Sequence, residues 1–407
     1  MTRAFSLAVV MAVLSAGDRA NGVALARIVV DSGKHERLDT PVCVALEGVA
    51  DPWRPMQLVE VTGGNRRPVA SQMEAGDPPV LWFILDGPTA QGSKRNYELI
   101  EGNPVAGPMV TAEMNGAALT VACSAGKVIR YNYEYVVPPQ GVDGSYIRSG
   151  YIHPLWSPSG LCVTDDLPPE HLHHKGIWFP WTKTEFEGRH PDFWNLGGKT
   201  GTVRFAGFEA VTSGTVWGGF KSRHEHVDLS APGHKVALLE QWDARVWNVG
   251  GPEKKYWLMD LTSRQRCATD SPLILPEYRY GGLGFRGNRE WGLMNNTFLT
   301  SEGKGRLDGH ATRAKWCDVA GTVGGKWTGA VIMGHPENFR FPEPMRIHPT
   351  EPFFCYAPSL AGDWKIEPGK EHVARYRFFV HDEKTTSEVA GRFWTDFGEP
   401  PEARIEK

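Results

Sequence analysis

Residues 57–85 read QLVEVTGGNRRPVASQMEAGDPPVLWFIL, and most of the chain repeats the pattern of this stretch. Two runs rich in β-branched and aromatic residues, Gln57–Val61 and Val80–Leu85, are separated by the turn signals Gly-Gly-Asn and Gly-Asp-Pro-Pro. Such runs favour strands, and Gly, Pro and Asn favour turns. The stretch therefore predicts short strands joined by tight turns.

The same pattern continues outward in both directions. Further strands are expected at Arg27–Asp31, Val42–Leu46, Leu119–Ala122, Val128–Tyr135, Thr202–Phe208, Lys235–Val246, Tyr256–Thr262, Gly329–Met333 and Val373–His381. Helical periodicity is nearly absent, and Thr386–Trp394 is the best candidate for a helix. Many short strands with Gly and Pro turns are typical of sandwiches and barrels. We therefore predict an all-β fold, a β-sandwich with an N-terminal β module.

A break between two β-rich parts falls at Val136–Tyr146, where Pro-Pro-Gln-Gly-Val-Asp-Gly interrupts the strands. Residues 27–140 are expected to form the N-terminal module. Residues 141–407 are expected to form a larger, His-rich sandwich that carries the catalytic site. The two parts can also pack as one continuous unit, and the sequence leaves both arrangements open.

Residues 1–16 have the plan of a secretory leader. Arg3 supplies a positive charge, Phe5–Leu14 is apolar or small apart from one serine, and Ser15–Gly17 offers small residues for cleavage. A second cleavage position follows Ala26, and a buried N-terminal strand or helix is the alternative. No other segment approaches the roughly 18–20 apolar residues of a membrane helix. We expect a soluble protein, periplasmic or extracellular, without stable membrane insertion.

Composition excludes several classes of protein. A formal net charge of −3 argues against nucleic acid as a partner. The six cysteines are scattered and form no C-x-x-C pair, which argues against a cysteine zinc site. The motifs of zincin proteases, nucleophile-elbow hydrolases and P-loop enzymes are also missing. The fifteen Trp suit large packed sheets, and some are candidate platforms for sugar rings.

One segment, from Tyr151 to Trp181, concentrates polar chemistry in what its prolines and glycines predict to be a loop. Four histidines and three carboxylates fall within 22 positions: His153, Asp165, Asp166, Glu170, His171, His173 and His174. If Glu170–His174 is extended, His171 and His173 share one face of the segment and His174 lies on the other. Two chemistries use such a set. The side chains can hold one divalent metal ion, with His171, His173 and His174 as ligands, or a histidine can move protons. The alternative is that some histidines only hydrogen-bond the loop.

Weaker candidates lie outside this loop. His224 and His226 alternate in an expected strand, but their charged neighbours favour an exposed polar strand. The glycines of Tyr280–Arg286 indicate a bulge or the close approach of backbone to a ligand, with Arg286 pointing into a cleft. His335 and Asn338 follow an apolar strand, where site residues often lie, and His381-Asp382 ends another strand in the same way.

Together these residues resemble a bacterial family of unknown function that carries the label "methane oxygenase PmoA-like". The matching positions are Arg148, Tyr151–Leu155, Pro158–Gly160, Pro168–Trp178, Tyr280–Arg286, Trp316–Asp318 and His335–Asn338. One departure is Glu170, where the family has Asp, and its longer arm makes a metal-ligand role less secure. The resemblance implies a galactose-mutarotase-like supersandwich and a place among the sugar-degrading proteins of polysaccharide-feeding bacteria.

The leading hypothesis is an exported carbohydrate-active enzyme, a glycoside hydrolase or sugar lyase. It would cleave or modify a glycoside, by hydrolysis or by elimination from an oxidised (keto) sugar. The candidate catalytic residues are His153, His173 and His174, supported by His171, Glu170 and His335. The candidate substrate-binding residues are Arg286, Asn338, Tyr151, Trp178, Trp181 and Trp194. Asp166 and Asp318 are the best pair for a two-carboxylate hydrolysis.

Two other classes of function stay open. A non-catalytic sugar-binding or cell-envelope protein would use the Trp residues without the histidines. A metal-binding or redox protein would carry copper or iron, although no Met-rich or Cys-containing ligand spacing supports it.

Overall fold

The computed structural model describes residues 23–406. The expected leader lies outside the described residues, whereas the later cleavage position, after Ala26, falls inside the first strand, β1 (Ala24–Asp31). Within the described range, no helix has the length and apolar character needed to cross a membrane.

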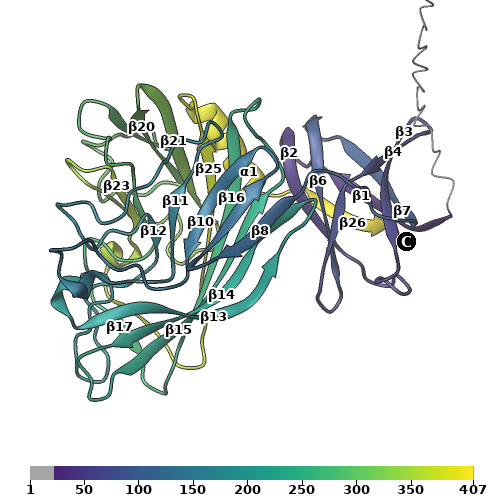
Figure 1. Ribbon diagram of the computed structural model, residues 1–407. Coiled ribbons are helices and arrows are strands. Elements are labelled where there is room, and N and C mark those ends of the chain that lie inside the picture. The colour runs from purple at the N-terminus through teal and green to yellow at the C-terminus, as the bar shows by residue number, and fades with distance from the viewer. Residues whose placement is uncertain (1–22, 407) are drawn as a thin grey trace, which may run out of the picture.

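The larger unit is a sandwich of two eight-stranded antiparallel sheets, and it lies on the left in Figure 1. The first, which we call the site sheet, consists in spatial order of β22 (Met345–Ile347), β23 (Phe353–Tyr356), β18 (Gly284–Arg286), β12 (Ile177–Trp178), β11 (Tyr151–Leu155), β10 (Gly126–Asn132), β9 (Ala118–Cys123) and β8 (Val110–Asn115). The second, the long-strand sheet, consists of β13 (Gly201–Thr212), β14 (Trp217–Asp228), β15 (Lys235–Trp247), β16 (Tyr256–Cys267), β25 (His372–His381), β21 (Lys326–Gly334), β20 (Trp316–Val323) and β19 (Asn296–Thr300). The predicted all-β sandwich is therefore confirmed.

Side-chain alternation in the site sheet separates the core from the outer face. Ile177 and Phe285 point inward and join the main apolar core between the two sheets. The neighbouring Trp178 points outward and packs with Trp194 and Phe353 in a separate cluster. Because successive strand residues face opposite sides, this alternation leaves the outer face of the site sheet to carry aromatic and polar side chains.

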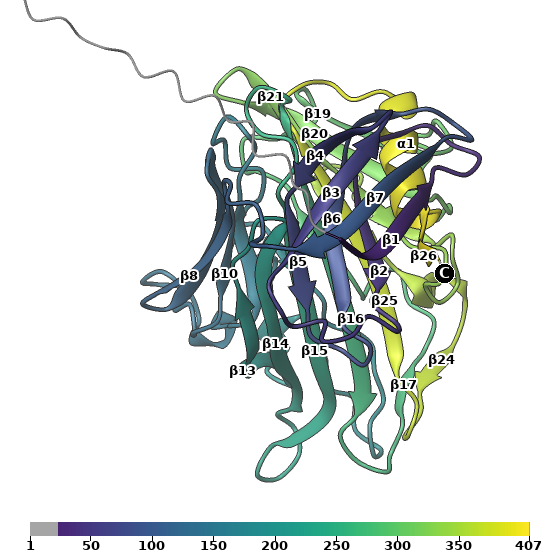
Figure 2. The ribbon, with the colours of Figure 1, turned by 90° about the vertical axis from the view of Figure 1, so that its right-hand side faces the viewer.

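The smaller unit is a sandwich of two short sheets with its own apolar core. One sheet consists in spatial order of β26 (Glu402–Glu406), β1, β7 (Lys94–Glu101), β3 (Met56–Thr62) and β4 (Asn65–Val69), and the other of β2 (Arg37–Ala45), β6 (Val80–Thr89) and β5 (Ser71–Glu74). Figure 2 shows β26, the last strand of the chain, beside β1. Since β8, β9 and β10 belong to the site sheet, the sheets divide the chain before Val110, earlier than the boundary expected near residue 140.

The smaller unit packs against the outer face of the long-strand sheet. Arg245 on β15 donates to both carboxylate oxygens of Glu74, at 2.8 and 2.7 Å. Trp82 and Trp247 meet with ring centroids 5.2 Å apart. This contact explains why β16 begins with four consecutive buried residues, Tyr256–Met259, because both of its faces are covered there.

The one α-helix of the described chain is α1 (Ser387–Gly398), which confirms the expected helix. The Thr386 hydroxyl caps it by accepting from the Val389 N–H at 3.2 Å. Buried Phe393 and Trp394 pack on the outer face of the long-strand sheet. Short elements complete the fold: a ribbon of β17 (Leu273–Leu275) and β24 (Trp364–Ile366), and 3-10 turns η1 (Gly144–Tyr146), η2 (Leu196–Gly198) and η3 (Pro358–Ala361).

A polar network lies inside the sandwich, and its centre is the buried carboxylate of Glu240 on β15. Glu240 accepts from His226 at 2.9 Å, Trp242 at 2.8 Å, Ser263 at 2.5 Å and Gln265 at 3.0 Å. The expectation of an exposed polar strand at His224 and His226 was wrong, because both rings point into the core.

Candidate functional site

The histidine-rich loop leaves and re-enters the site sheet at one place. The backbones of Asp166 and Lys175 pair there, next to β12. Two consecutive turns then curl the loop, since the His171 N–H donates to the Pro168 carbonyl at 3.0 Å and the His174 N–H to the His171 carbonyl at 2.8 Å. The extended conformation considered from the sequence is therefore wrong, and the turns bring all three histidines to one side.

Four imidazole rings meet above the outer face of the site sheet. His171 and His174 stack with centroids 4.8 Å apart, and His173 meets His174 edge-on at 4.7 Å. The fourth ring, His348, lies 5.4 Å from His171 and comes from the loop between β22 and β23. The pairing of β18 with β23 places this second loop beside the first.

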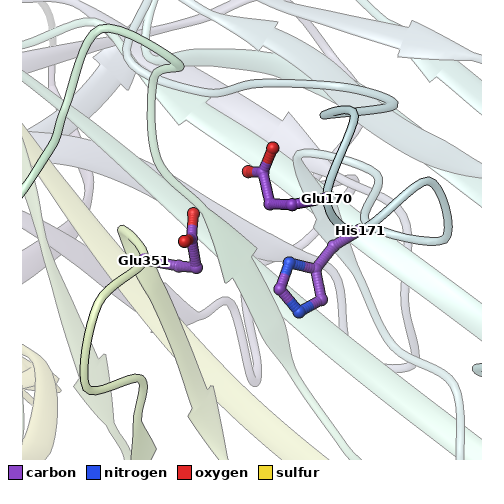
Figure 3. A group of neighbouring side chains, drawn as sticks. All are labelled: Glu170, His171 and Glu351. Atoms are coloured by element: carbon purple, nitrogen blue, oxygen red, sulfur yellow. The ribbon is translucent and has the colours of Figure 1, made fainter.

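Two carboxylates and a guanidinium lie next to this cluster. Arg286, at the end of β18, is almost completely buried, and its Nη2 donates to Glu170 and, at 3.1 Å, to Glu351. Figure 3 shows the two carboxylates on the same side of the His171 ring. Arg286 thus joins the two loops. The sequence had instead led us to expect that it points freely into a cleft.

A cavity of about 240 Å³ opens in front of the rings. The four histidines line it together with Arg279, Arg346, Trp194, Tyr280 and Phe353. None of these lining residues carries a carboxylate. The cavity therefore combines proton-transfer groups, two positive charges and aromatic surface in one small volume.

The four rings are neutral at neutral pH. Burial, and then the neighbouring His171, lowers the pKa of His173 to about 4. Burial, followed by the charge of Arg346, lowers the pKa of His348 to about 4. Burial also lowers the pKa of His171, and holds that of His174 well below its usual value. Each neutral ring offers one donor and one acceptor nitrogen.

The tautomer of His348 follows from its hydrogen bonds. Its Nδ1 accepts from the Glu351 N–H at 3.0 Å, so a neutral ring carries its proton on Nε2. His173 makes no hydrogen bond to another described residue, and both of its nitrogens are free to meet a ligand. The cavity therefore holds a preset donor in His348 and an unengaged ring in His173.

A model described as "Family of unknown function (DUF6807)" matches residues 118–395. This match covers more than half of the chain and includes every residue that lines the cavity. The chain belongs to this family. No curated protein matches the chain at a significant level. The DUF6807 region begins in β9 and ends in α1, so every strand of the smaller unit lies outside it.

Sequence reasoning missed several residues of the DUF6807 site: His348, Glu351, Arg279 and Arg346. One signal was present for the first two, because His348 follows a short apolar strand in a Pro-bounded loop. That is the pattern which drew attention to His335. The arginines carried no motif: Arg346 reaches the cavity through the pairing of β22 with β23, and Arg279 through the loop before β18.

Three predicted site residues lie elsewhere. His153 contacts Thr164 through Nδ1 at 3.0 Å and does not line the cavity. His335 packs against Phe397 of α1. The amide of Asn338 donates to Glu343 at 2.9 Å and accepts from the Arg375 N–H, so it orders a loop. His335 and Asn338 follow β21 of the long-strand sheet, which keeps them away from the cavity, whereas His153 lies within β11 of the site sheet.

The aromatic platforms also need correction. Trp178 and Trp181 are completely buried, and the indole of Trp181 donates to Gln265 at 2.6 Å inside the core. Trp194 is equally buried, but it alone of the three predicted tryptophans reaches the cavity wall. A Cβ at Gly284 would lie 2.8 Å from the Trp194 ring. This glycine therefore makes room for the indole, and not for a ligand as the glycines of Tyr280–Arg286 had suggested.

Other predicted groups serve buried contacts. The Tyr151 hydroxyl donates to Asp166 at 2.7 Å, and Asp166 also faces the buried Lys175 at 3.3 Å. Asp318 pairs with His381 at 2.9 Å, away from the cavity. Asp166 and Asp318 therefore do not face each other across a substrate site.

The group that could hold a divalent metal differs from the one expected from the sequence. Among the described residues, Glu170, His171 and Glu351 form the one group whose ligand atoms all lie within 4.8 Å of one another. The trio expected from the sequence, His171, His173 and His174, does not converge in this way. Two carboxylates and an imidazole suit a divalent ion. However, the Arg286 guanidinium already supplies the positive charge between the carboxylates.

Replacing Arg286 with methionine is expected to create a metal site. The change leaves the carboxylates of Glu170 and Glu351 beside His171 without their cation. We expect the purified wild type to contain no stoichiometric divalent metal, and Arg286→Met to retain Zn²⁺ after desalting, both measured by elemental analysis. Arg289→Met, which removes an exposed arginine paired with Asp165, is the matched control and should take up none. Stoichiometric metal in the wild type that is lost in Glu351→Gln would contradict this assignment.

Proposed function

We propose that this DUF6807 protein is an exported carbohydrate-active enzyme that cleaves a glycoside by elimination, with histidines as acid and base. The observation that carries the proposal is the cavity itself, in which four neutral imidazoles meet two arginines and an aromatic wall. Aromatic surface suits the apolar face of a sugar ring, and neutral imidazoles suit proton transfer.

Elimination is favoured over hydrolysis by the absence of carboxylates among the lining residues. Hydrolysis of a glycoside ordinarily uses two carboxyl groups that flank the scissile bond. Elimination instead needs a base for the proton beside a carbonyl or carboxylate, a donor for the departing sugar oxygen, and positive charge for the enolate that forms. The lining residues supply these three requirements.

Roles follow from the hydrogen bonding of each ring. We assign His173 as the base, because its nitrogens are unengaged and its low pKa keeps it unprotonated. We assign His348 as the donor, because its Nδ1 accepts from backbone and leaves the proton on Nε2. His171 and His174 stack together, and they hold His173 in place by contact with its ring.

A screen of glycosides tests the proposal. Purified protein is incubated with keto-sugar glycosides, uronic-acid glycosides and plain glycosides, and two products are followed in parallel. Elimination gives a new conjugated double bond, detected by ultraviolet absorbance, whereas hydrolysis gives a reducing end without it. Elimination products from the wild type, lost in His174→Ala but kept in His190→Ala at an exposed position, support the proposal.

Other outcomes of the screen identify the alternatives. Binding of a glycoside without turnover, with unchanged affinity in His174→Ala, would make the protein a sugar-binding module. A redox-active wild type with bound copper or iron would favour the class suggested by the methane oxygenase label. Release of reducing ends without a double bond would replace elimination by hydrolysis.

A further inference from the structure

Two arginines in the cavity have no acidic partner. Neither Arg279 nor Arg346 forms an ion pair with a carboxylate of the described chain, whereas the buried Arg37, Arg286 and Arg377 each do. Arg346 lies in the middle of β22, and its Nη1 lies 3.3 Å from His310 Nε2, which is placed to accept a hydrogen bond. Arg279 lies over the ring of Tyr280, with its Cζ 5.6 Å from the ring centroid.

The positive charge of this pair is not neutralised by its surroundings. Burial first, and then the charge of Arg279, lowers the pKa of the half-buried Arg346. The nearby carboxylates of Glu170 and Glu351 are already paired with Arg286. The cavity is thus positive in a protein whose formal net charge is −3. A site of this kind attracts an anion from solution.

A second feature of the cavity wall also lacks a partner. The His174 ring is 3% exposed, and its Nδ1 has no hydrogen-bond partner among the described residues. Leaving a buried polar nitrogen unsatisfied is unfavourable. A ligand with oxygen atoms would satisfy both this ring and the two guanidinium groups.

We propose that the cavity binds a sugar through an anionic substituent held by Arg346 and Arg279, with a uronic-acid carboxylate as the favoured group. The guanidinium fork matches the two oxygens of a carboxylate, and it also matches a sulfate ester. A volume of about 240 Å³ suits a single sugar residue and not an extended chain. This inference rests on the proposed function for the choice of a sugar as the ligand, but it does not require that the protein converts that sugar.

A carboxylate in this position also fits the elimination chemistry. In a uronic acid the carboxylate lies next to the carbon that loses its proton. The base takes that proton, the bond to the departing sugar oxygen breaks, and the oxygen receives a proton, so that no oxidant or water is consumed. The arginines would stabilise the negative charge that builds on the carboxylate during proton removal.

Calorimetric titration tests the proposal with four probes: glucuronate, glucose 6-sulfate, glucose and acetate. Glucuronate is expected to bind, and glucose to bind at least about tenfold more weakly because it lacks the charged hydrogen bonds. Arg346→Gln should weaken glucuronate binding by about tenfold or more and leave glucose unchanged. Arg266→Gln removes an exposed arginine far from the cavity and should change neither value. Because Arg346→Gln could disturb β22, the exposed Arg279→Gln is tested as well.

Each outcome decides the inference. If sulfate binds and glucuronate does not, the anion site stands and its substituent is the sulfate ester. If acetate binds as tightly as glucuronate, the site is for anions without sugar, which overturns both this inference and the proposed function. If no acidic probe binds better than glucose, the anion inference is overturned, while turnover of neutral glycosides would still support the proposed function.

Discussion

Replacing His173 with alanine is expected to lower kcat/KM for the elimination reaction by about 10²–10⁴-fold, the usual contribution of a positioned acid or base. The His173 ring makes no hydrogen bond to other described residues, and, unlike His171 and His174, it has no nitrogen that is both buried and unpartnered. The change therefore removes a functional group without leaving a protein partner unsatisfied. KM should change little, since the arginines hold the substrate. The measurement is steady-state kinetics on the substrate that the screen identifies.

The pH dependence provides a sharper check on His173. Its pKa of about 4 in the free protein means that the base is available at neutral pH, and that kcat/KM falls only as the pH drops through about 4. A bound anion favours the protonated ring, so the acid limb of kcat should lie at a higher pH. An unchanged rate in His173→Ala, or acid limbs of kcat and kcat/KM that fall at the same pH, would show that His173 is not the base. His190→Ala serves as the control.

Replacing Glu240 with alanine is expected to lower the free energy of unfolding by about 3–5 kcal/mol. The change leaves the polar groups of His226, Trp242, Ser263 and Gln265 without their acceptor inside the sandwich. Chemical denaturation measures the effect. Glu225→Ala, one strand away and paired with Arg204 at the surface, is the matched control and should cost less than about 1 kcal/mol.

Acid should erase part of this effect. Burial raises the pKa of Glu240, but the hydrogen bond from His226 and the nearby ring of His224 outweigh burial and hold the folded-state pKa below its usual 4.5. A lowered carboxyl pKa adds stability above the unfolded value, and this stability is lost as the pH falls. The difference in stability between the wild type and Glu240→Gln should therefore be largest near neutral pH and shrink below about pH 4.5. A difference that is constant with pH would show that the charge of Glu240 contributes nothing.

Local pattern was sufficient to predict the strands but not their partners. Runs such as Lys235–Val246 are predicted as strands by their residue types, and each expected strand is present. The pairing of β8, β9 and β10 with the site sheet, and of β26 with β1, depends on contacts between distant segments. A proline-rich break near residue 140 marks a loop and not a change of sheet, which is why the two units divide earlier. The galactose-mutarotase-like relation stays a prediction.

The candidate site was also predicted only in part, because local pattern shows residues that are adjacent in the sequence but not which distant segments meet. His171, His173 and His174 are adjacent in the sequence, and their density was visible. Their convergence depends on two turns that alternation rules do not foresee. His348 had a weak local signal, the short apolar strand before it, but the pairing of β22, β23 and β18 that brings it and Arg346 to the cavity leaves none. Trp178 and Trp181 were misassigned because composition does not distinguish a buried indole from an exposed one.

The pairing of β1 with β26 has a consequence for how the chain is made. Synthesis delivers β1 well before its neighbour on one side, which consists of residues 402–406. Until those residues leave the ribosome, one edge of β1 carries unpaired backbone groups, and such an edge is a template for association with other chains. The nascent protein is therefore exposed to aggregation from the synthesis of β1 until that of β26, and a chaperone that covers an open strand edge would protect it over that interval.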